Sequence, residues 1–379
     1  MSPSPALRWE LEGRERRHWY TLRLEHLHTL PEPWTLEDDF RRVLAWRSLG
    51  VDDVLEVSVP WSQDPEVKWR DLREESPRGT VLVREYETPA GRLRHAVRQS
   101  GEEMGPGWVR QPDHVPLFED MNIPRAAEQA VSSPGEIKHV PYLYAAPDAE
   151  ARGWFAERMG QVRAFAEAQG VAVQAWSAFG MDAVVWLTGA EGAVLMAMEA
   201  PEAFAELVEA VAVTDLARTE MAASTPGVDI VAQRGWYSST DFWSPRLFDR
   251  FVLPYVREMA AVAHRHGVRF AYVMTTGVET LGPRLAEAGV DLLYFVDPVQ
   301  DTITLAKARE LLGGRMALAG GLNSLTLATG VEKVRAEVHK ALEALSPTGR
   351  FILQPVDALF PDTPWEGGEA MIEAWREWR

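Results

Sequence analysis

The feature that most constrains the fold is the alternation of short apolar runs with longer helical patterns from residue 171 to the C-terminus. Such an order is typical of strand–helix–strand units, in which each helix returns the chain to the same end of a parallel sheet. Strands are predicted at 171–176, 228–234, 268–274, 290–296, 316–320 and 350–356, and helices near 201–223, 244–266, 278–288, 302–312, 329–345 and 364–378. The pattern predicts an α/β protein with a parallel sheet.

The helix at 244–266 is predicted from its ends and its periodicity. Ser244 is a good N-cap, Pro245 suits the first helical position, and Gly267 is a typical helix end. Apolar residues recur between them at three- and four-residue spacing, which predicts one buried face.

The first half of the chain adds two predicted strands and an insertion. A helix that follows Thr35 and ends at Gly50 leads into a strand at 53–59, and a further strand is predicted at 19–24. Together with the six later strands they make eight, so we expect a (β/α)8 TIM barrel formed by one domain over 1–379. Alternating polarity over 66–98, with a turn at residues 88–91, predicts an antiparallel insertion near the mouth of the barrel.

Composition excludes several classes of partner. The formal net charge of −17 repels nucleic acid and anionic membrane surfaces, and no apolar run reaches the length of a membrane span. We therefore expect a cytoplasmic protein with a small-molecule substrate, no nucleic acid and no membrane; a homodimer stays open. The absence of cysteine excludes thiolate nucleophiles and thiolate metal sites.

Polar residues at the predicted strand ends are the candidates for chemistry, because barrel enzymes build their sites in the loops that follow the strands. The predicted catalytic residues are Asp182, Tyr237, Asp241 and Asp357, and the predicted substrate-binding residues are Arg234, Trp236, Thr275, Thr276, Asp297, Asn323 and Gln354. Carboxylates that converge on one mouth can supply an acid and a base, and arginine can bind a substrate carboxylate. In the alternative interpretation, Asp241 contributes to a helix entry, Asp297 opens a turn before Pro298, and the aromatic residues are packing.

Several segments follow one another in an order that resembles a known superfamily. The most specific is Ser244-Pro245 followed by Phe248, Phe251 and Pro254-Tyr255; segments 179–189, 289–291 and 319–323 complete the order. Over roughly 35–379 the chain resembles the uroporphyrinogen decarboxylase superfamily, which includes decarboxylases of haem synthesis and cobalamin-linked methyltransferases. The resemblance implies a barrel with its site at the strand ends.

The chain departs from both branches at their functional motifs. Zinc methyltransferases carry a histidine, a spacer and a cysteine before a glycine, where this chain has Met274-Thr275-Thr276-Gly277, and Asp357 falls near their third ligand. The decarboxylases have an arginine-rich N-terminal signature, which the segment 13–18 matches poorly, and a histidine where this chain again has Asp357. We expect no metal site and no cofactor.

Three functions remain open at this point. The first is a metal-free lyase of the decarboxylase type that acts on a carboxylated substrate, with tetrapyrroles as one option. The second is a methyltransferase-like relative that works with a corrinoid protein or a methyl donor without a zinc thiolate site. The third is a non-catalytic ligand-binding barrel. Turnover, complex formation with a corrinoid protein, and tight binding without turnover would distinguish them.

Overall fold

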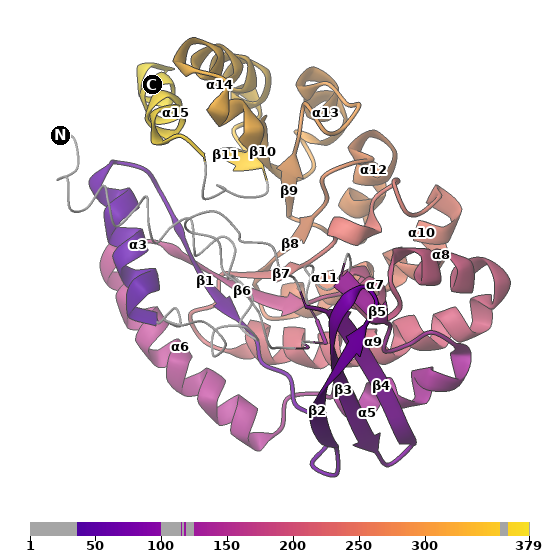
Figure 1. The fold of residues 1–379 in the computed structure, drawn as a ribbon. Helices are drawn as coiled ribbons and strands as arrows, with labels where there is room; N and C mark the ends of the chain where they lie inside the picture. The colour runs from indigo at the N-terminus through magenta and orange to yellow at the C-terminus, as the bar shows by residue number, and fades with distance from the viewer. Residues whose placement is uncertain (1–35, 100–114, 116, 119–124, 357–362, 379) are drawn as a thin grey trace.

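The computed structural model describes residues 36–99, 115, 117–118, 125–356 and 363–378, and these contain a curled parallel sheet of seven strands (Figure 1). Its strands pair in sequential order: β1 (Val54–Ser58), β6 (Ala172–Ala178), β7 (Ile230–Gln233), β8 (Arg269–Val273), β9 (Leu292–Val296), β10 (Ala317–Asn323) and β11 (Phe351–Val356). The six strands predicted after residue 171 and the strand at 53–59 are thereby confirmed. The strand predicted at 19–24 lies outside the described residues.

Helices cover the convex face of the sheet (Figure 1). The α-helices of the described chain are α3 (Leu36–Ser48), α5 (Val140–Leu143), α6 (Ala149–Gln169), α7 (Met181–Thr188), α8 (Ala190–Glu199), α9 (Pro201–Ser224), α10 (Pro245–Phe251), α11 (Leu253–Arg265), α12 (Val278–Ala288), α13 (Leu305–Leu312), α14 (Val331–Leu345) and α15 (Trp365–Trp378). Short 3-10 helices add η3 (Pro134–His139), η4 (Trp236–Ser238), η5 (Ser324–Ala328) and η6 (Ser346–Thr348).

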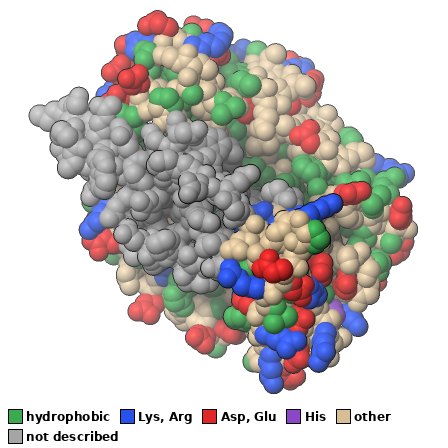
Figure 2. Space-filling view, in the orientation of Figure 1, with side chains coloured by type: hydrophobic (Ala, Val, Ile, Leu, Met, Phe, Trp, Pro, Cys, Tyr) green, Lys and Arg blue, Asp and Glu red, His purple; other side chains and the backbone are tan. Residues whose placement is uncertain are grey.

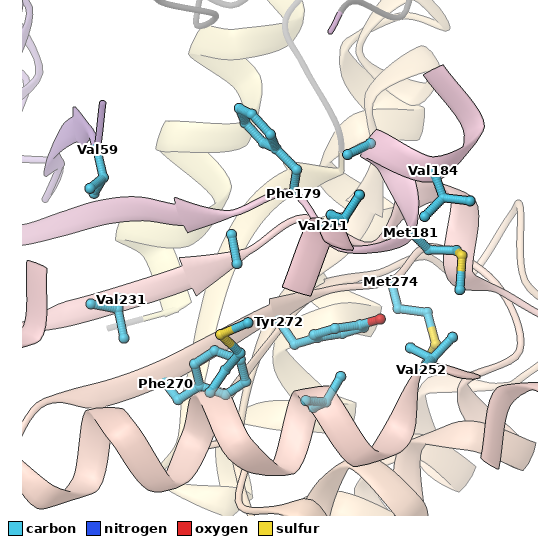
Figure 3. Packing of buried hydrophobic residues seen from close by; sticks show 14 of the residues in the cluster. Val59, Phe179, Met181, Val184, Val211, Val231, Val252, Phe270, Tyr272 and Met274 are labelled. Atoms are coloured by element: carbon cyan, nitrogen blue, oxygen red, sulfur yellow. The ribbon is translucent and has the colours of Figure 1, made fainter. Parts of the chain in front are cut away.

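The two faces of the sheet carry different side chains because successive residues of a strand point to opposite sides. Val231 and Phe270 belong to the large core between the sheet and the helices, and Figure 3 shows them there. Their neighbours Ala232 and Ala271 belong to a separate cluster on the concave face. Small side chains on that face leave room for the larger polar and aromatic groups described below.

The helix predicted at 244–266 is two helices, α10 and α11, so its continuity was wrongly predicted. Ser244 caps α10 as expected, with its side chain accepting a hydrogen bond from the backbone N–H of Leu247. The break falls at Val252, two residues before Pro254, which lies in the first turn of α11. Proline has no N–H to donate and its ring clashes with the preceding turn, so the apolar period continues across a kink that it does not reveal.

An antiparallel sheet follows β1, as the alternation over 66–98 predicts. It contains β2 (Lys68–Ser76), β3 (Gly79–Thr88) and β4 (Gly91–Arg98), to which β5 (Ala126–Glu128) adds a strand that was not predicted. The chain then passes to Val131, whose N–H donates to the carbonyl oxygen of Leu187 in α7 at 2.9 Å. Since α7 follows the carboxyl end of β6, this sheet lies beside the predicted mouth (Figure 1). A covering role for it remains a prediction.

Within the described residues, no helix taken alone combines the length and apolarity of a membrane span. Helices α7 and α8 meet that criterion only as a pair, and they are bent by 101° with respect to each other.

Candidate functional site

An ion pair lies where β6 and β7 end. Asp182 stands in the first turn of α7 and is fully buried, and Arg234 directly follows β7. The Nε of Arg234 donates to Oδ2 of Asp182 at 3.1 Å, and the backbone N–H of Tyr237 donates to Oδ1 at 3.0 Å. Asp182 therefore fixes the arginine and the η4 turn, a positioning role compatible with its predicted place at the site.

Aromatic rings surround the guanidinium of Arg234. Its central carbon lies 4.3 Å from the ring centroid of Trp236 and 4.9 Å from that of Trp186. The ring of Trp236 continues a series on the concave face, since its centroid is 6.2 Å from that of Trp176 and 5.8 Å from that of Phe295. A cation among flat rings suits a planar, anionic molecule.

The predicted Tyr237, Asp241 and Thr276 lie in the loops that follow β7 and β8. Tyr237 packs edge-on against Phe242, and the hydroxyl of Thr276 donates to Oδ2 of Asp241 at 2.6 Å. This bond joins the loops that follow β7 and β8. Ser244 caps α10, and the carboxylate of Asp241 is bound by Thr276, so the helix-entry interpretation of Asp241 remains open. Thr275 is buried next to this contact.

Asp297 and Asn323 form the turns after β9 and β10. Oδ1 of Asp297 accepts from the N–H groups of Val299 (2.8 Å) and Gln300 (3.2 Å), and Oδ2 accepts from the side-chain amide of Asn323 at 2.7 Å. Asn323 in turn caps η5 through Leu325. The two bonds to Oδ1 form the turn after β9, as the turn interpretation expects, and the bond from Asn323 joins that turn to the loop after β10.

Gln354 lies partly exposed in β11, and Asp357 lies outside the described residues. The prediction that Asp182 and Asp357 face one pocket therefore remains a prediction. Nothing in the described ranges places three His, Asp or Glu side chains where they could hold a metal ion.

A polar cluster deeper on the concave face was missed by the sequence analysis. Oε1 of Glu56 in β1 accepts from Nε1 of Trp176 at 3.1 Å and from Nε2 of Gln174 at 3.3 Å. The hydroxyl of Tyr294 in β9 donates to Oε1 of Gln174 at 2.8 Å. A search confined to strand ends overlooks mid-strand residues. The signal was the strand 54–58, where Leu55 and Val57 alternate with Glu56 and so place it on the inner face.

Burial raises the pKa of Glu56 to about 7. Removal from water is the largest cause; the positive charge of Arg42 opposes it, and the negative charge of Asp53 adds to it. The guanidinium of Arg42 binds both carboxylate oxygens of Asp53, at 2.7 and 2.6 Å, and not those of Glu56. The side chain of Glu56 is largely removed from water but retains some exposed surface, so it can both hold a proton at neutral pH and exchange it.

A surface hollow of about 830 Å³ lies elsewhere, on the antiparallel sheet. Acidic and basic side chains crowd this part of the surface (Figure 2), and Arg94 pairs there with Glu74 and Glu128. Because these charges satisfy one another in a water-exposed setting, the hollow offers little to a specific ligand, and the strand ends remain the candidate site.

The turn at Gly235 gives a test of how this site is held. A Cβ at Gly235 would lie 2.4 Å from the carbonyl oxygen of Val273 in β8. Gly235→Ala is expected to force β7 and β8 apart and to lower the free energy of unfolding by about 1–3 kcal/mol, measured by urea denaturation. Gly153→Ala is the control: this exposed position in α6 has nothing within 4 Å of an added Cβ, so alanine should raise stability slightly. Equal stabilities for the two variants would contradict the close approach.

Sequential parallel strands, helices on the convex face and polar residues at the strand ends together define an α/β protein of the barrel type with its candidate site at the carboxyl ends of the strands. The model of the family described as uroporphyrinogen decarboxylase (URO-D) matches residues 118–378. The chain belongs to the uroporphyrinogen decarboxylase family.

Similar proteins agree with this family and differ in their named activities. The chain is 26% identical over 184 residues to a uroporphyrinogen decarboxylase of Geobacter metallireducens, a match that covers 47% of this chain and 50% of that protein. It is 34% identical over 106 residues to the enzyme of Bordetella petrii, which covers 27% and 28% of the two chains. The chain thus spans at most about half the length of these relatives. A solved methyltransferase from Methanosarcina mazei shares the fold, with a TM-score of 0.54 and 16% identity over 94% of this chain and 90% of that one.

Proposed function

We propose that this chain is a metal-free carbon–carbon lyase that removes a carboxyl group from a flat, carboxylated substrate, with tetrapyrroles as the leading class. The observation that carries the proposal is Arg234, placed between Trp186 and Trp236 and held by the buried Asp182. Family membership and the named activity of the curated relatives support it. The proposal includes a closed eight-stranded barrel, with the segment 19–24 as its eighth strand.

The chemistry of the proposed site follows from its parts. A guanidinium matches a carboxylate in geometry and charge, and indole rings stack on a planar ring system. Decarboxylation also needs an acid that protonates the carbon losing its carboxyl group. Asp182 is a poor candidate for that acid, because its two carboxylate oxygens already accept hydrogen bonds from Arg234 and from the backbone N–H of Tyr237.

A methyltransferase-like activity is the second candidate, because the similarity to the Methanosarcina mazei structure extends over nearly the whole chain. It would require a methyl donor or a corrinoid protein as partner. The segment Met274-Thr275-Thr276 offers no zinc-binding side chain of the usual kind, so such an activity would have to proceed without a zinc thiolate.

Substitution of Arg234 tests the proposed substrate class. We expect Arg234→Gln to weaken binding of uroporphyrin, a planar molecule with eight carboxyl groups, by about tenfold or more, because a charged hydrogen bond contributes about 1.5–3 kcal/mol. Binding is measured by fluorescence titration and stability on the same samples by thermal unfolding.

The matched control is Arg284→Gln, which removes an arginine paired with Asp249 on the outer surface of α12. Uroporphyrin should bind this variant as it binds the native chain. Equal affinities for the Arg234 and Arg284 variants, or a native chain that neither binds uroporphyrin nor releases CO2 from uroporphyrinogen, would contradict the proposed function.

A further inference from the structure

The polar cluster around Glu56 is assembled from strands that are not neighbours. Glu56 in β1 stands opposite Gln174 in β6, whereas Tyr294 comes from β9, which is separated from β6 by β7 and β8. The Tyr294 hydroxyl nevertheless reaches Gln174 at 2.8 Å. Such a contact requires that the sheet curl so that the inner faces of β6 and β9 meet. The cluster therefore occupies the inside of the curled sheet, below the strand ends.

The two carboxylate oxygens of Glu56 differ in their surroundings. Both hydrogen bonds that reach Glu56 from the described part of the chain end on Oε1. Oε2 has no protein partner among those residues, and the side chain keeps some exposed surface. One oxygen is thus anchored, and the other is available for a proton and for a ligand.

Aromatic rings connect Glu56 with Arg234. Trp176 donates to Glu56, its ring neighbours that of Trp236, and the Trp236 ring lies under the Arg234 guanidinium. A planar molecule with one carboxylate at Arg234 would lie along these rings and extend toward Glu56.

The charges that face Glu56 are few. The charges that act on Glu56 come from Arg42 and Asp39 in α3 and from Asp53, which directly precedes β1. Tyr294 faces the cluster from β9. Arg42 forms its ion pair with Asp53, so none of these groups forms an ion pair with Glu56. Burial and the two nearby carboxylates therefore prevail and favour the protonated form.

We propose that Glu56 is the proton donor of this site, an inference that rests on the proposed function. The bond between the departing carboxylate and its carbon breaks, CO2 leaves, and the bonding electron pair stays with that carbon. The proton on Oε2 of Glu56 passes to that carbon, and water returns a proton to the resulting carboxylate. Each turnover thus releases one CO2 and consumes one proton from solvent.

Two measurements test this role. The first follows the indole ¹⁵N–H resonance of Trp176 against pH, assigned with Trp176→Phe; it should titrate with a midpoint near 7 in the native chain and lose this titration in Glu56→Gln. The second measures CO2 release from uroporphyrinogen, where Glu56→Gln should lower kcat by about 10²-fold or more while uroporphyrin still binds. Glu56→Asp should restore part of the activity.

The control is Asp52→Asn, the same chemical change at a side chain that is 88% exposed and four residues away. It should retain native activity and the Trp176 titration. A Trp176 resonance that is constant between pH 5 and 9, or a Glu56→Gln variant with native kcat, would overturn the proposal. A native chain that releases no CO2 would contradict the proposed function. The Trp176 titration would then still show whether Glu56 holds a proton at neutral pH.

Discussion

Replacing Arg218 with methionine is expected to lower the free energy of unfolding by about 3–5 kcal/mol, because it leaves a buried charge without its partner. Arg218 is 1% exposed and lies 3.4 Å from Asp215, which is fully buried. Its Nε and Nη2 also donate to the carbonyl oxygen of Val59 at 3.0 and 2.6 Å. Methionine fills much of the volume but makes none of these bonds.

The same substitution should disturb the candidate site. Asp215 accepts hydrogen bonds from the backbone N–H groups of Phe179 (3.1 Å) and Gly180 (2.7 Å), directly before the helix that carries Asp182. We therefore expect Arg218→Met to weaken uroporphyrin binding in addition to stability. Urea denaturation and fluorescence titration measure the two effects.

Arg284→Met is the control, because its partner Asp249 is solvent-exposed and such pairs contribute about 1 kcal/mol or less. If both substitutions change the free energy of unfolding equally, the buried contacts of Arg218 with Asp215 and Val59 do not make the expected contribution to stability.

The second expected result is that Glu56 makes stability fall as pH rises. The folded-state pKa of about 7 lies above the ordinary value of 4.5, so the neutral form is favoured in the folded state. The contribution of Glu56 is fully present below about pH 4.5 and is lost as pH rises through 7. Its size is on the order of 3 kcal/mol, since each of the roughly 2.5 pKa units corresponds to about 1.4 kcal/mol.

Glu56→Gln isolates this contribution, because glutamine resembles the protonated side chain at every pH. Urea denaturation of both proteins between pH 4.5 and 8 should show the variant gaining stability relative to the native chain as pH increases. Effects of other titrating groups cancel in the difference. A difference that is independent of pH, or one that grows toward low pH, would contradict a raised pKa.

The strands were predictable because their residues repeat the same physical pattern. Runs such as Leu292–Val296 are apolar or aromatic throughout, as expected of a strand covered on both faces, and the intervening helices have clear ends. The kink at Pro254 and the strand β5 were not predictable in the same way. The apolar period of the helix continues across the proline, and a strand of three residues carries too short a pattern to stand out.

Only part of the candidate site could be predicted from the sequence. Position after a strand predicted Arg234 and Asp182 together, and the structure joins them. The same rule selected Asp297 and Asn323, whose contacts serve turns, because strand ends must also be capped. Glu56 and Tyr294 both bond Gln174 only because the sheet curls, and a one-dimensional pattern does not contain the distance between β6 and β9.

The segment between β1 and α6, which contains the antiparallel sheet, is closed by a bridge between its two ends. Ser62 and Ala145 exchange two backbone hydrogen bonds, of 3.0 and 2.9 Å, where the chain leaves the parallel sheet and returns to it. Loop-closure entropy grows only slowly with length, so an exposed turn inside the clasped stretch, such as the one between β2 and β3, can be lengthened at small energetic cost. The clasp therefore lets such a turn change in length while the register of β1 against β6, set directly before the clasp, stays fixed.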